Sequence, residues 1–338
     1  MQDRSYDVAI AGGGFVGRTL ALALVRLAPQ GFRIVLVDAE PPDSGIADAR
    51  ASALSAATKN LLSVLGLWER LDAEAQPILA IEITDSPLNA GLRPHLLGFD
   101  DEMREGEPGA YMIENSDLQR ALATAVAGHS AIDIFAAESI ADFTSDAFRS
   151  VAKLASGDRI EAPLLVGADG KRSRLRDHAG IKCVGWSYPQ LGIVTTVAHS
   201  KPHEGRAVQH FLPAGPFAVL PLKGNRSSIV WTEGKERGEA IMAAGEADFL
   251  AELTARFGHR LGKIALTGPR QSFPLDFQVA RSFVADRLVL VGDAAHVVHP
   301  LAGQGLNIGM RDVAALTETI VDATRLGLDI GASIQLER

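Results

Sequence analysis

The pattern of apolar and polar positions predicts a strand–turn–helix–strand unit at the N-terminus. The stretch "YDVAIAGGGFVGRTLALALVRLAPQGFRIVLVDAE" begins with a short apolar run, passes through glycines into an apolar helix, and returns to a second apolar run. Uninterrupted apolar runs are typical of parallel strands that are covered on both faces. Strands that alternate with helices in this way indicate an α/β fold with a parallel sheet.

A different pattern occupies residues 181–267. Apolar and polar residues alternate there in short runs such as "GIVTTVAH", "FAVLPL" and "SSIVWTE", which Pro and Gly separate. Such alternation is typical of antiparallel sheet. The buried-strand pattern resumes on either side of this segment, in "RIEAPLLVGADG" and "DRLVLVGD". We therefore predict an α/β protein with a Rossmann-like domain of parallel sheet (1–75, 105–180 and 268–338) and an inserted antiparallel-sheet domain (76–104 and 181–267).

Composition and charge narrow the function classes. The chain has 338 residues, 47% of them hydrophobic, so global disorder is excluded. A net charge of −8 without a long Lys/Arg block argues against nucleic-acid binding. The single cysteine, Cys183, allows no disulfide within the chain and no zinc-ligand spacing, and it suits a reducing compartment. No apolar run approaches the ~20 residues that span a bilayer. We expect a cytoplasmic protein, with peripheral contact at the inner membrane face left open.

A dinucleotide-binding fingerprint follows the first strand. Gly12, Gly14 and Gly17 have G-x-G-x-x-G spacing, and Asp38 ends the next strand about 20 residues further on, as the fingerprint requires. The first glycine permits the turn, the second lets the backbone approach a pyrophosphate, and the third lets helix and strand pack closely. The acid accepts hydrogen bonds from a ribose.

Two more glycine–acid motifs also follow buried strands. They are "GADG", with Gly167 and Asp169, and "GD", formed by Gly292 and Asp293. The carboxyl ends of parallel strands gather at one edge of the sheet, where cofactors bind. Since there is no second G-x-G-x-x-G, the three motifs predict one extended dinucleotide held from three places.

Several polar residues near these motifs allow more than one interpretation. Arg50 lies in a loop beside two acids, either as a solvated surface residue or facing a bound anion. Asn115 or Ser116 is expected to cap the helix that follows. His296 and His299 could act as bases, but we expect them to pack or cap around their loop.

The run "HPLAGQGLNIGMRD", from His299 to Asp312, leads into the last long helix. A helix cap explains one glycine and leaves the Gln, the Asn and the other glycines without a reason. Gly303 and Gly305 remove Cβ atoms that would hold the backbone away from a flat ligand. The helix that begins beside them offers free N–H groups and a positive dipole end to a negatively charged ring.

Taken together, "GGGFVG", "GADGKRSRLR" and "LVLVGDAAHVVHPLAGQGLNIGMRD" resemble the class A flavin monooxygenases, which share the fold of p-hydroxybenzoate hydroxylase. Within that class, the run from His299 to Asp312 resembles the signature of the ubiquinone-biosynthesis hydroxylases. The similarity extends from the N-terminus to the last residue. Because such relatives continue in helices beyond this point, we expect the natural chain to continue past residue 338.

The resemblance implies that the Rossmann-like domain binds FAD. Asp38 would hold the adenosine ribose, and Asp293 would contact the ribityl and pyrophosphate region. Asp169 would serve both FAD and the nicotinamide donor. Arg50 and Asn115 would lie beside the flavin, and the backbone N–H groups of Leu306 and Asn307 would face its pyrimidine edge.

The resemblance also implies the reaction. NADH or NADPH would reduce FAD, and O2 would supply one oxygen atom through a flavin C4a-hydroperoxide to the ring of a polyprenylated phenol. The carbonyl of Pro300 would contact the substrate, and Phe211, Phe217 and Leu220 would form an apolar wall. Two other readings stay open: an FAD oxidoreductase that acts on another lipid, and a flavin-binding scaffold subunit of a biosynthetic complex. Association with other ubiquinone-biosynthesis proteins and homo-oligomer formation also stay open.

Overall fold

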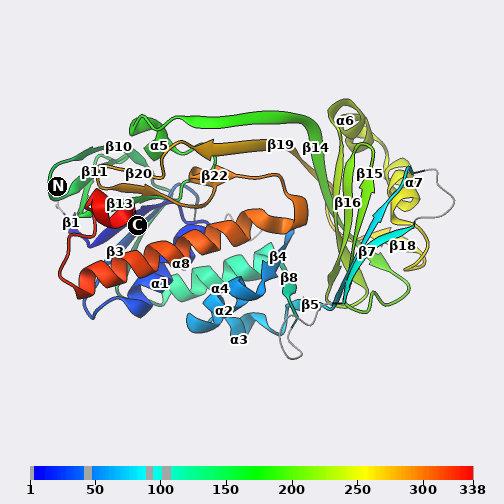
Figure 1. Ribbon diagram of the computed structural model, residues 1–338, viewed down its shortest axis with the longest axis horizontal. Coiled ribbons are helices and arrows are strands. Elements are labelled where there is room, and N and C mark those ends of the chain that lie inside the picture. Colours follow the sequence, from blue (N-terminus) through cyan, green and yellow to red (C-terminus); the bar gives the residue numbers. More distant parts are fainter. Residues whose placement is uncertain (1–3, 42–47, 89–93, 101–107, 338) are drawn as a thin grey trace.

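A mostly parallel sheet forms the centre of the larger part of the molecule (Figure 1). The computed structural model describes residues 4–41, 48–88, 94–100 and 108–337. In this part of the chain, the sheet has the order β20–β21–β13–β2–β3–β9, and all neighbours are parallel except β20 and β21. Its strands are β20 (Val284–Ala285), β21 (Leu288–Leu290), β13 (Leu164–Gly167), β2 (Val8–Ala11), β3 (Ile34–Asp38) and β9 (Ile132–Ala136). Every residue of β2, β3 and β13 is buried, as their apolar runs predict.

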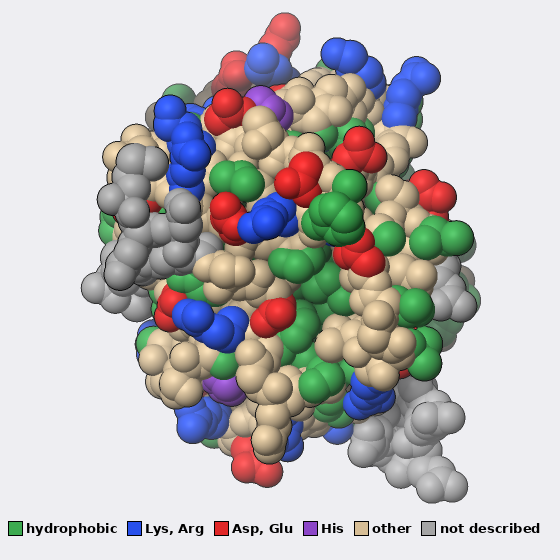
Figure 2. Space-filling view, turned by 90° about the vertical axis from the view of Figure 1, so that its left-hand side faces the viewer, with side chains coloured by type: hydrophobic (Ala, Val, Ile, Leu, Met, Phe, Trp, Pro, Cys, Tyr) green, Lys and Arg blue, Asp and Glu red, His purple; other side chains and the backbone are tan. Residues whose placement is uncertain are grey.

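Helices cover one face of this sheet and a second sheet covers the other. The helices are α1 (Phe15–Leu27), α4 (Asn115–Ala127) and α8 (Gln304–Arg325), whose apolar side chains share one core with the sheet. The opposite face packs on strands β1 (Arg4–Ser5), β12 (Arg159–Ala162), β11 (Ser150–Leu154) and β10 (Ile140–Ser145), and on α5 (Arg174–His178). The left-hand end of the molecule in Figure 1, which faces the viewer in Figure 2, shows charges of both signs interspersed with apolar side chains.

A small antiparallel sheet connects the two parts of the molecule. It consists of β4 (Ala51–Ser55), β8 (Ala110–Glu114) and β5 (Gln76–Ile78). The short helices α2 (Ala56–Val64) and α3 (Trp68–Leu71) follow β4, and α9 (Ser333–Leu336) follows α8. Among the described residues, no helix is both long and apolar enough to cross a membrane.

The second part is a large sheet with the order β22–β19–β14–β17–β16–β15–β6–β7, to which β18 adds by pairing with β14. Its pairs are antiparallel except β15 with β6, which are parallel. The strands are β6 (Ala80–Asp85), β7 (His95–Asp100), β14 (Cys183–His199), β15 (Arg206–Leu212), β16 (Gly215–Leu222), β17 (Arg226–Gly234), β18 (Ile264–Leu266), β19 (Gln271–Ala280) and β22 (His296–Val297). Helices α6 (Lys235–Ala243) and α7 (Glu246–Phe257) cover one face. This arrangement agrees with the predicted inserted antiparallel sheet.

The long strands β14 and β19 join the two parts (Figure 1). The first half of β19 pairs with β14 near residues 191–194, and the second half pairs near residues 183–187. The sheet therefore continues past residue 268, where the sequence pattern placed a domain boundary. Similarly, β5 pairs with β8 in the small sheet, although residue 76 was expected to open the inserted domain. Hydrogen bonding between distant strands, which apolar patterning does not encode, sets these limits.

The two faces of the large sheet separate the expected substrate-lining residues. Neighbouring residues of a strand point to opposite faces. Phe217 is 1% exposed, and its ring lies 6.0 Å from that of Trp231 in the core beneath α6 and α7. Leu220 packs on the other face, toward β4 and β8. The prediction that Phe217 forms part of a substrate wall is therefore wrong, because it lies on the helix-covered face.

Candidate cofactor-binding site

Two of the fingerprint glycines pack as closely as their spacing predicts, and the third borders open space. A Cβ on Gly12, whose φ is +109°, would lie 2.2 Å from the carbonyl oxygen of Ala168, and one on Gly17 would lie 1.9 Å from that of Gly12. Both glycines therefore permit close packing of the turn. A Cβ on Gly14, the N-cap of α1, would meet no described protein atom within 4 Å. The space before the α1 N-terminus is thus open to an anionic ligand.

Asp38 lies directly against the fingerprint turn. Its Oδ1 accepts a hydrogen bond from the Glu40 N–H at 3.2 Å, and its Oδ2 is 3.4 Å from the Arg18 guanidinium. A Cβ on Gly13 would lie 1.9 Å from Asp38 Oδ2. Gly13, the middle glycine of "GGG", therefore makes room for the acid, a role that the fingerprint spacing does not reveal.

The "GD" motif forms a tight 3-10 turn, η2 (Gly292–Ala294), at the end of β21. Gly292 has φ +59°, and its N–H donates to Asp312 Oδ2 at 2.7 Å. The Asp293 side chain is exposed to solvent, although enough protein atoms lie near its carboxyl group to desolvate it in part. This burial raises the pKa of Asp293, and the charges of His296, Arg50 and Lys171 oppose the shift. Asp293 and Arg50 thus lie close enough for their charges to interact.

His296 is bonded into the fold in the way that we expected. Its Nε2 lies 2.7 Å from Asp312 Oδ2, the same oxygen that accepts from Gly292. The hydrogen bond with Asp312 raises the pKa of His296, and burial only partly offsets it. His299 packs edge-on against Tyr188, with ring centroids 5.3 Å apart.

This pairing predicts a pH-dependent stability. A histidine whose pKa is raised in the folded state stabilises the fold fully below its unfolded pKa, about 6.5, and loses that contribution as pH rises through the folded pKa. Urea unfolding at about pH 6 and about pH 9 should therefore show a larger loss of stability for the native chain than for His296→Gln. Identical changes in the two proteins would contradict the charged pair.

In the "GADG" motif, one carboxylate oxygen of Asp169 holds the following turn and is therefore not free to bind a ligand. Asp169 Oδ2 accepts from the Arg174 N–H at 2.8 Å, at the start of α5, and Oδ1 is buried with no hydrogen-bond partner among the described residues. The buried Arg176 guanidinium donates to the carbonyls of Lys171 and Ala294. It thereby ties this motif to the "GD" turn. Direct contact of Asp169 with a cofactor stays a prediction.

Arg50 and Asn115 meet through an acid that the sequence reasoning did not single out. Asp48 accepts from Arg50 Nε at 2.8 Å and from Asn115 Nδ2 at 2.9 Å. Burial raises the pKa of Asp48, but these hydrogen bonds outweigh it and hold the pKa below its usual value. The hydrogen bond with Asp48 likewise raises the pKa of Arg50, whose guanidinium lies 5.0 Å from the Phe273 ring centroid.

Neither Asn115 nor Ser116 caps α4. The N-cap residue is Glu114, without a side-chain cap, and the helix begins at Asn115. The Asn115 side chain is instead buried, and its Oδ1 accepts from Ser52 Oγ at 2.7 Å. The Asn115 amide bonds to Ser52 of β4 and to Asp48, so it is not used to cap the helix. The expected place of Asn115 beside the cofactor stays a prediction.

The glycine-rich loop folds as a 3-10 turn, η3 (Leu301–Gly303), followed by α8. Gly303 is the N-cap of α8 in a left-handed conformation, with φ +63°. A Cβ on Gly305 would meet no described protein atom within 4 Å. The N–H groups of Gly305 and Leu306 belong to the first three helical residues, which have no partner within the helix. This backbone is therefore open to a flat ligand.

Asn307 contributes through its side chain rather than its backbone. As the fourth residue of α8, its N–H falls within the hydrogen-bond ladder of an α-helix, so the expected backbone contact of Asn307 is corrected. Its amide donates to the carbonyls of Ala53 and Gly303, and its Oδ1 accepts from the Ser55 N–H and from Thr58 Oγ1. This buried clamp fixes α8 against β4.

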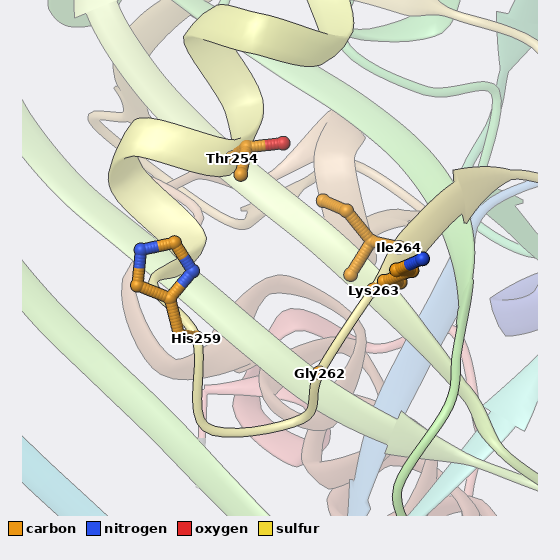
Figure 3. Close-up of a pocket in the computed structure, with 5 residues that line it drawn as sticks. All are labelled: Thr254, His259, Gly262, Lys263 and Ile264. Carbon is orange, nitrogen blue, oxygen red and sulfur yellow. The ribbon is translucent and has the colours of Figure 1, made fainter.

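Two of the remaining expected substrate contacts lie on the sheet face toward β4 and β8, and the third, Pro300, is the N-cap of η3. Leu220 packs near Ala53 of β4, and strand alternation places Phe211 on the same sheet face as Ala207 of that cluster. The Pro300 carbonyl accepts from the Gly303 N–H at 3.2 Å, which leaves a second lone pair. A separate hollow of about 420 Å³ lies beyond the end of α7, and none of the expected site residues lines it (Figure 3).

Comparison with known proteins agrees with this geometry. The chain matches the family model described as "FAD binding domain" over residues 5–325. It is 45% identical to ubiquinone hydroxylase UbiL of Rhodospirillum rubrum, over 98% of this chain and 76% of that protein. It is 35% identical to 3-demethoxyubiquinol 3-hydroxylase of Escherichia coli, over 97% of this chain and 82% of that protein.

The fold is also shared with solved structures. PqsL of Pseudomonas aeruginosa, in complex with 2-aminobenzoylacetate, superposes with a TM-score of 0.82 at 22% identity, over 99% of this chain and 92% of that chain. For p-nitrophenol 4-monooxygenase PnpA of Pseudomonas putida, the TM-score is 0.78 at 20% identity, over 98% of this chain and 83% of that chain. These similarities confirm the predicted α/β architecture with its large antiparallel sheet.

Proposed function

Because the chain belongs to the FAD binding domain family, we propose that it is an FAD-dependent monooxygenase that hydroxylates the aromatic ring of a polyprenylated phenol in ubiquinone biosynthesis. The observation that carries this proposal is the 45% identity, over nearly the whole chain, to a ubiquinone hydroxylase. The Escherichia coli relative, which is 35% identical, is named as a 3-demethoxyubiquinol 3-hydroxylase. The electron donor is NADH or NADPH.

The residues present fit FAD. Open space before Gly14 and the free N–H groups of α1 suit the pyrophosphate, and Asp38 suits the adenosine ribose. Open space before Gly305 suits the flavin ring, with Arg50 and Asn115 in the network beside it. When bound, FAD supplies the redox chemistry for O2 activation.

The chain's own residues bind and orient. The positive end of α8 favours negative charge on the flavin ring. Leu220 and Phe211 offer an apolar surface next to β4 and β8, where the substrate ring and its prenyl tail are kept from water. The Pro300 carbonyl accepts the hydrogen bond of a substrate hydroxyl.

The reconstituted enzyme tests this function. Purified chain with FAD should oxidise NADH or NADPH faster when a prenylated phenol is added, and the product should gain one oxygen atom by mass. A flavin-binding scaffold predicts no stimulation by the phenol. If the protein is instead an FAD oxidoreductase that acts on another lipid, the product should carry no new hydroxyl group on its ring. The phenolic intermediate that accumulates in cells lacking the protein identifies the substrate.

Asp293→Ala should lower FAD occupancy after dialysis. It removes the carboxylate that we assign to the ribityl and pyrophosphate region, whose charge interacts with that of Arg50. One lost hydrogen bond to a charged group corresponds to about 1.5–3 kcal/mol, or roughly a 10- to 100-fold rise in Kd. Flavin absorbance per protein measures the occupancy. Full retention of FAD by the variant would show that the "GD" turn is misassigned.

A further inference from the structure

Arg18 occupies a costly position for an arginine. It is the fourth residue of α1, immediately after the last fingerprint glycine, and it is only 8% exposed. A cation near the start of a helix opposes the helix dipole, and a buried guanidinium loses its hydration. No acidic residue lies in the first turn of α1 to compensate. A side chain in such a place needs an anionic partner from elsewhere in the fold.

That partner is Asp38 at the end of β3. The side chains of Arg18 and Asp38 are 10% and 12% exposed, and Arg18 NH2 lies 3.4 Å from Asp38 Oδ2. Among the described residues, the other oxygen of Asp38 accepts one hydrogen bond, from the Glu40 N–H at 3.2 Å. Among the described residues, removal of Arg18 would leave the Glu40 N–H as the one hydrogen-bond donor to this buried carboxylate, which is a costly arrangement for a buried charge.

Gly13 completes the arrangement. Asp38 Oδ2 would lie 1.9 Å from a Cβ at this position, so the carboxylate rests on the fingerprint backbone where any side chain would displace it. The Arg18 guanidinium, on α1, donates a hydrogen bond to the same oxygen. The carboxylate is therefore fixed between two adjacent segments of the fingerprint.

We propose that Arg18 is a positioning residue that holds the Asp38 carboxylate for the adenosine ribose and thereby gives the site its preference for FAD over FMN, which lacks the adenosine half. This inference rests on the proposed use of FAD. Arg18 acts through Asp38 and does not meet the flavin ring. Its loss therefore weakens binding of the adenosine half and leaves binding of the flavin half unchanged.

Titration of the flavin-free protein with FAD and with FMN, followed by flavin fluorescence, tests the proposal. Arg18→Met should raise the Kd for FAD about tenfold, or about 1.4 kcal/mol, and leave the Kd for FMN within about twofold. Arg18→Lys should fall between, because an ammonium keeps the charge but not the guanidinium geometry. Arg26→Met, at an exposed position of the same helix, is the matched control and should change neither constant.

A double-mutant cycle with Asp38→Asn distinguishes positioning from general stability. If Arg18 acts through Asp38, the double variant should bind FAD no more weakly than Asp38→Asn alone. An equal loss of FAD and FMN, additive losses, or an unchanged preference would overturn the proposal. If Arg18→Met does not fold, the cycle is run with Arg18→Lys and judged by the same outcomes. Failure of the native chain to bind either flavin would instead refute the proposed function.

Discussion

Gly305→Val is expected to abolish productive flavin binding while the chain stays folded. A Cβ at this position points into space that no described protein atom fills, and the cofactor ring is proposed to lie there. A branched side chain would hold the ring away from the α8 N-terminus, and a displacement of about 1 Å can cost about 10²-fold in rate. Phenol-dependent NADH or NADPH oxidation, together with flavin content, measures the effect.

The helix itself should tolerate this change. Valine is a slightly better helix former than glycine, so α8 gains no intrinsic penalty. Gly234→Val is the matched control, because a Cβ there also meets no described protein atom and the site lies at the start of α6, in the other part of the molecule. If Gly305→Val hydroxylates the phenol at the wild-type rate, the backbone at this position does not approach a flat ring.

Asn307→Leu should destabilise the protein and loosen the flavin loop together. The substitution leaves the part-buried Ser55 N–H and Ala53 carbonyl without Asn307, and the buried Thr58 hydroxyl keeps only its contact with Ser55 Oγ. Each lost partner of this kind costs about 1–3 kcal/mol, so a total loss of about 2–4 kcal/mol in unfolding free energy is expected. Denaturant unfolding and FAD titration of the same samples measure the two effects.

Thr58→Val provides the graded comparison. It is nearly isosteric, and Asn307 keeps its bonds to Ser55, Ala53 and Gly303, so a loss of only about 1 kcal/mol is expected. Asn307→Asp keeps both acceptor contacts but loses both donors, and it should fall between the other two variants. Equal stability of Asn307→Leu and Thr58→Val would show that the clamp does not hold α8 on β4.

The sequence predicted a structural element well where the residues that determine it lie close together along the chain. The spacing of Gly12, Gly14 and Gly17 predicts a tight turn between strand and helix, and Gly17 packs against Gly12 within that unit. The contact of Gly12 with Ala168, at the end of β13, comes from a distant part of the chain. The buried runs of β2, β3 and β13 are apolar throughout because both faces are covered, and this pattern is visible without the rest of the fold.

Side-chain partners were harder to predict, because they come from far along the chain. The amide of Asn115 meets Asp48 and Ser52, more than 60 positions away, so a local rule assigned it to a helix cap. Asn307 meets residues 53–58, about 250 positions away. The backbone of such a residue follows from its neighbours, but the side chain takes whichever partner the fold brings near.

What the sequence by itself determined was the α/β organisation, the three glycine–acid motifs at strand ends, and the open glycine-rich start of α8. These depend on periodicity and on conformations that only glycine adopts at low cost. Tertiary structure alone decided that Phe217 faces the helix-side core while Leu220 faces β4, since alternation fixes opposite faces but not which of them is covered by helices. It also decided that Arg18 meets Asp38, because an ion pair forms only where packing brings its two residues together.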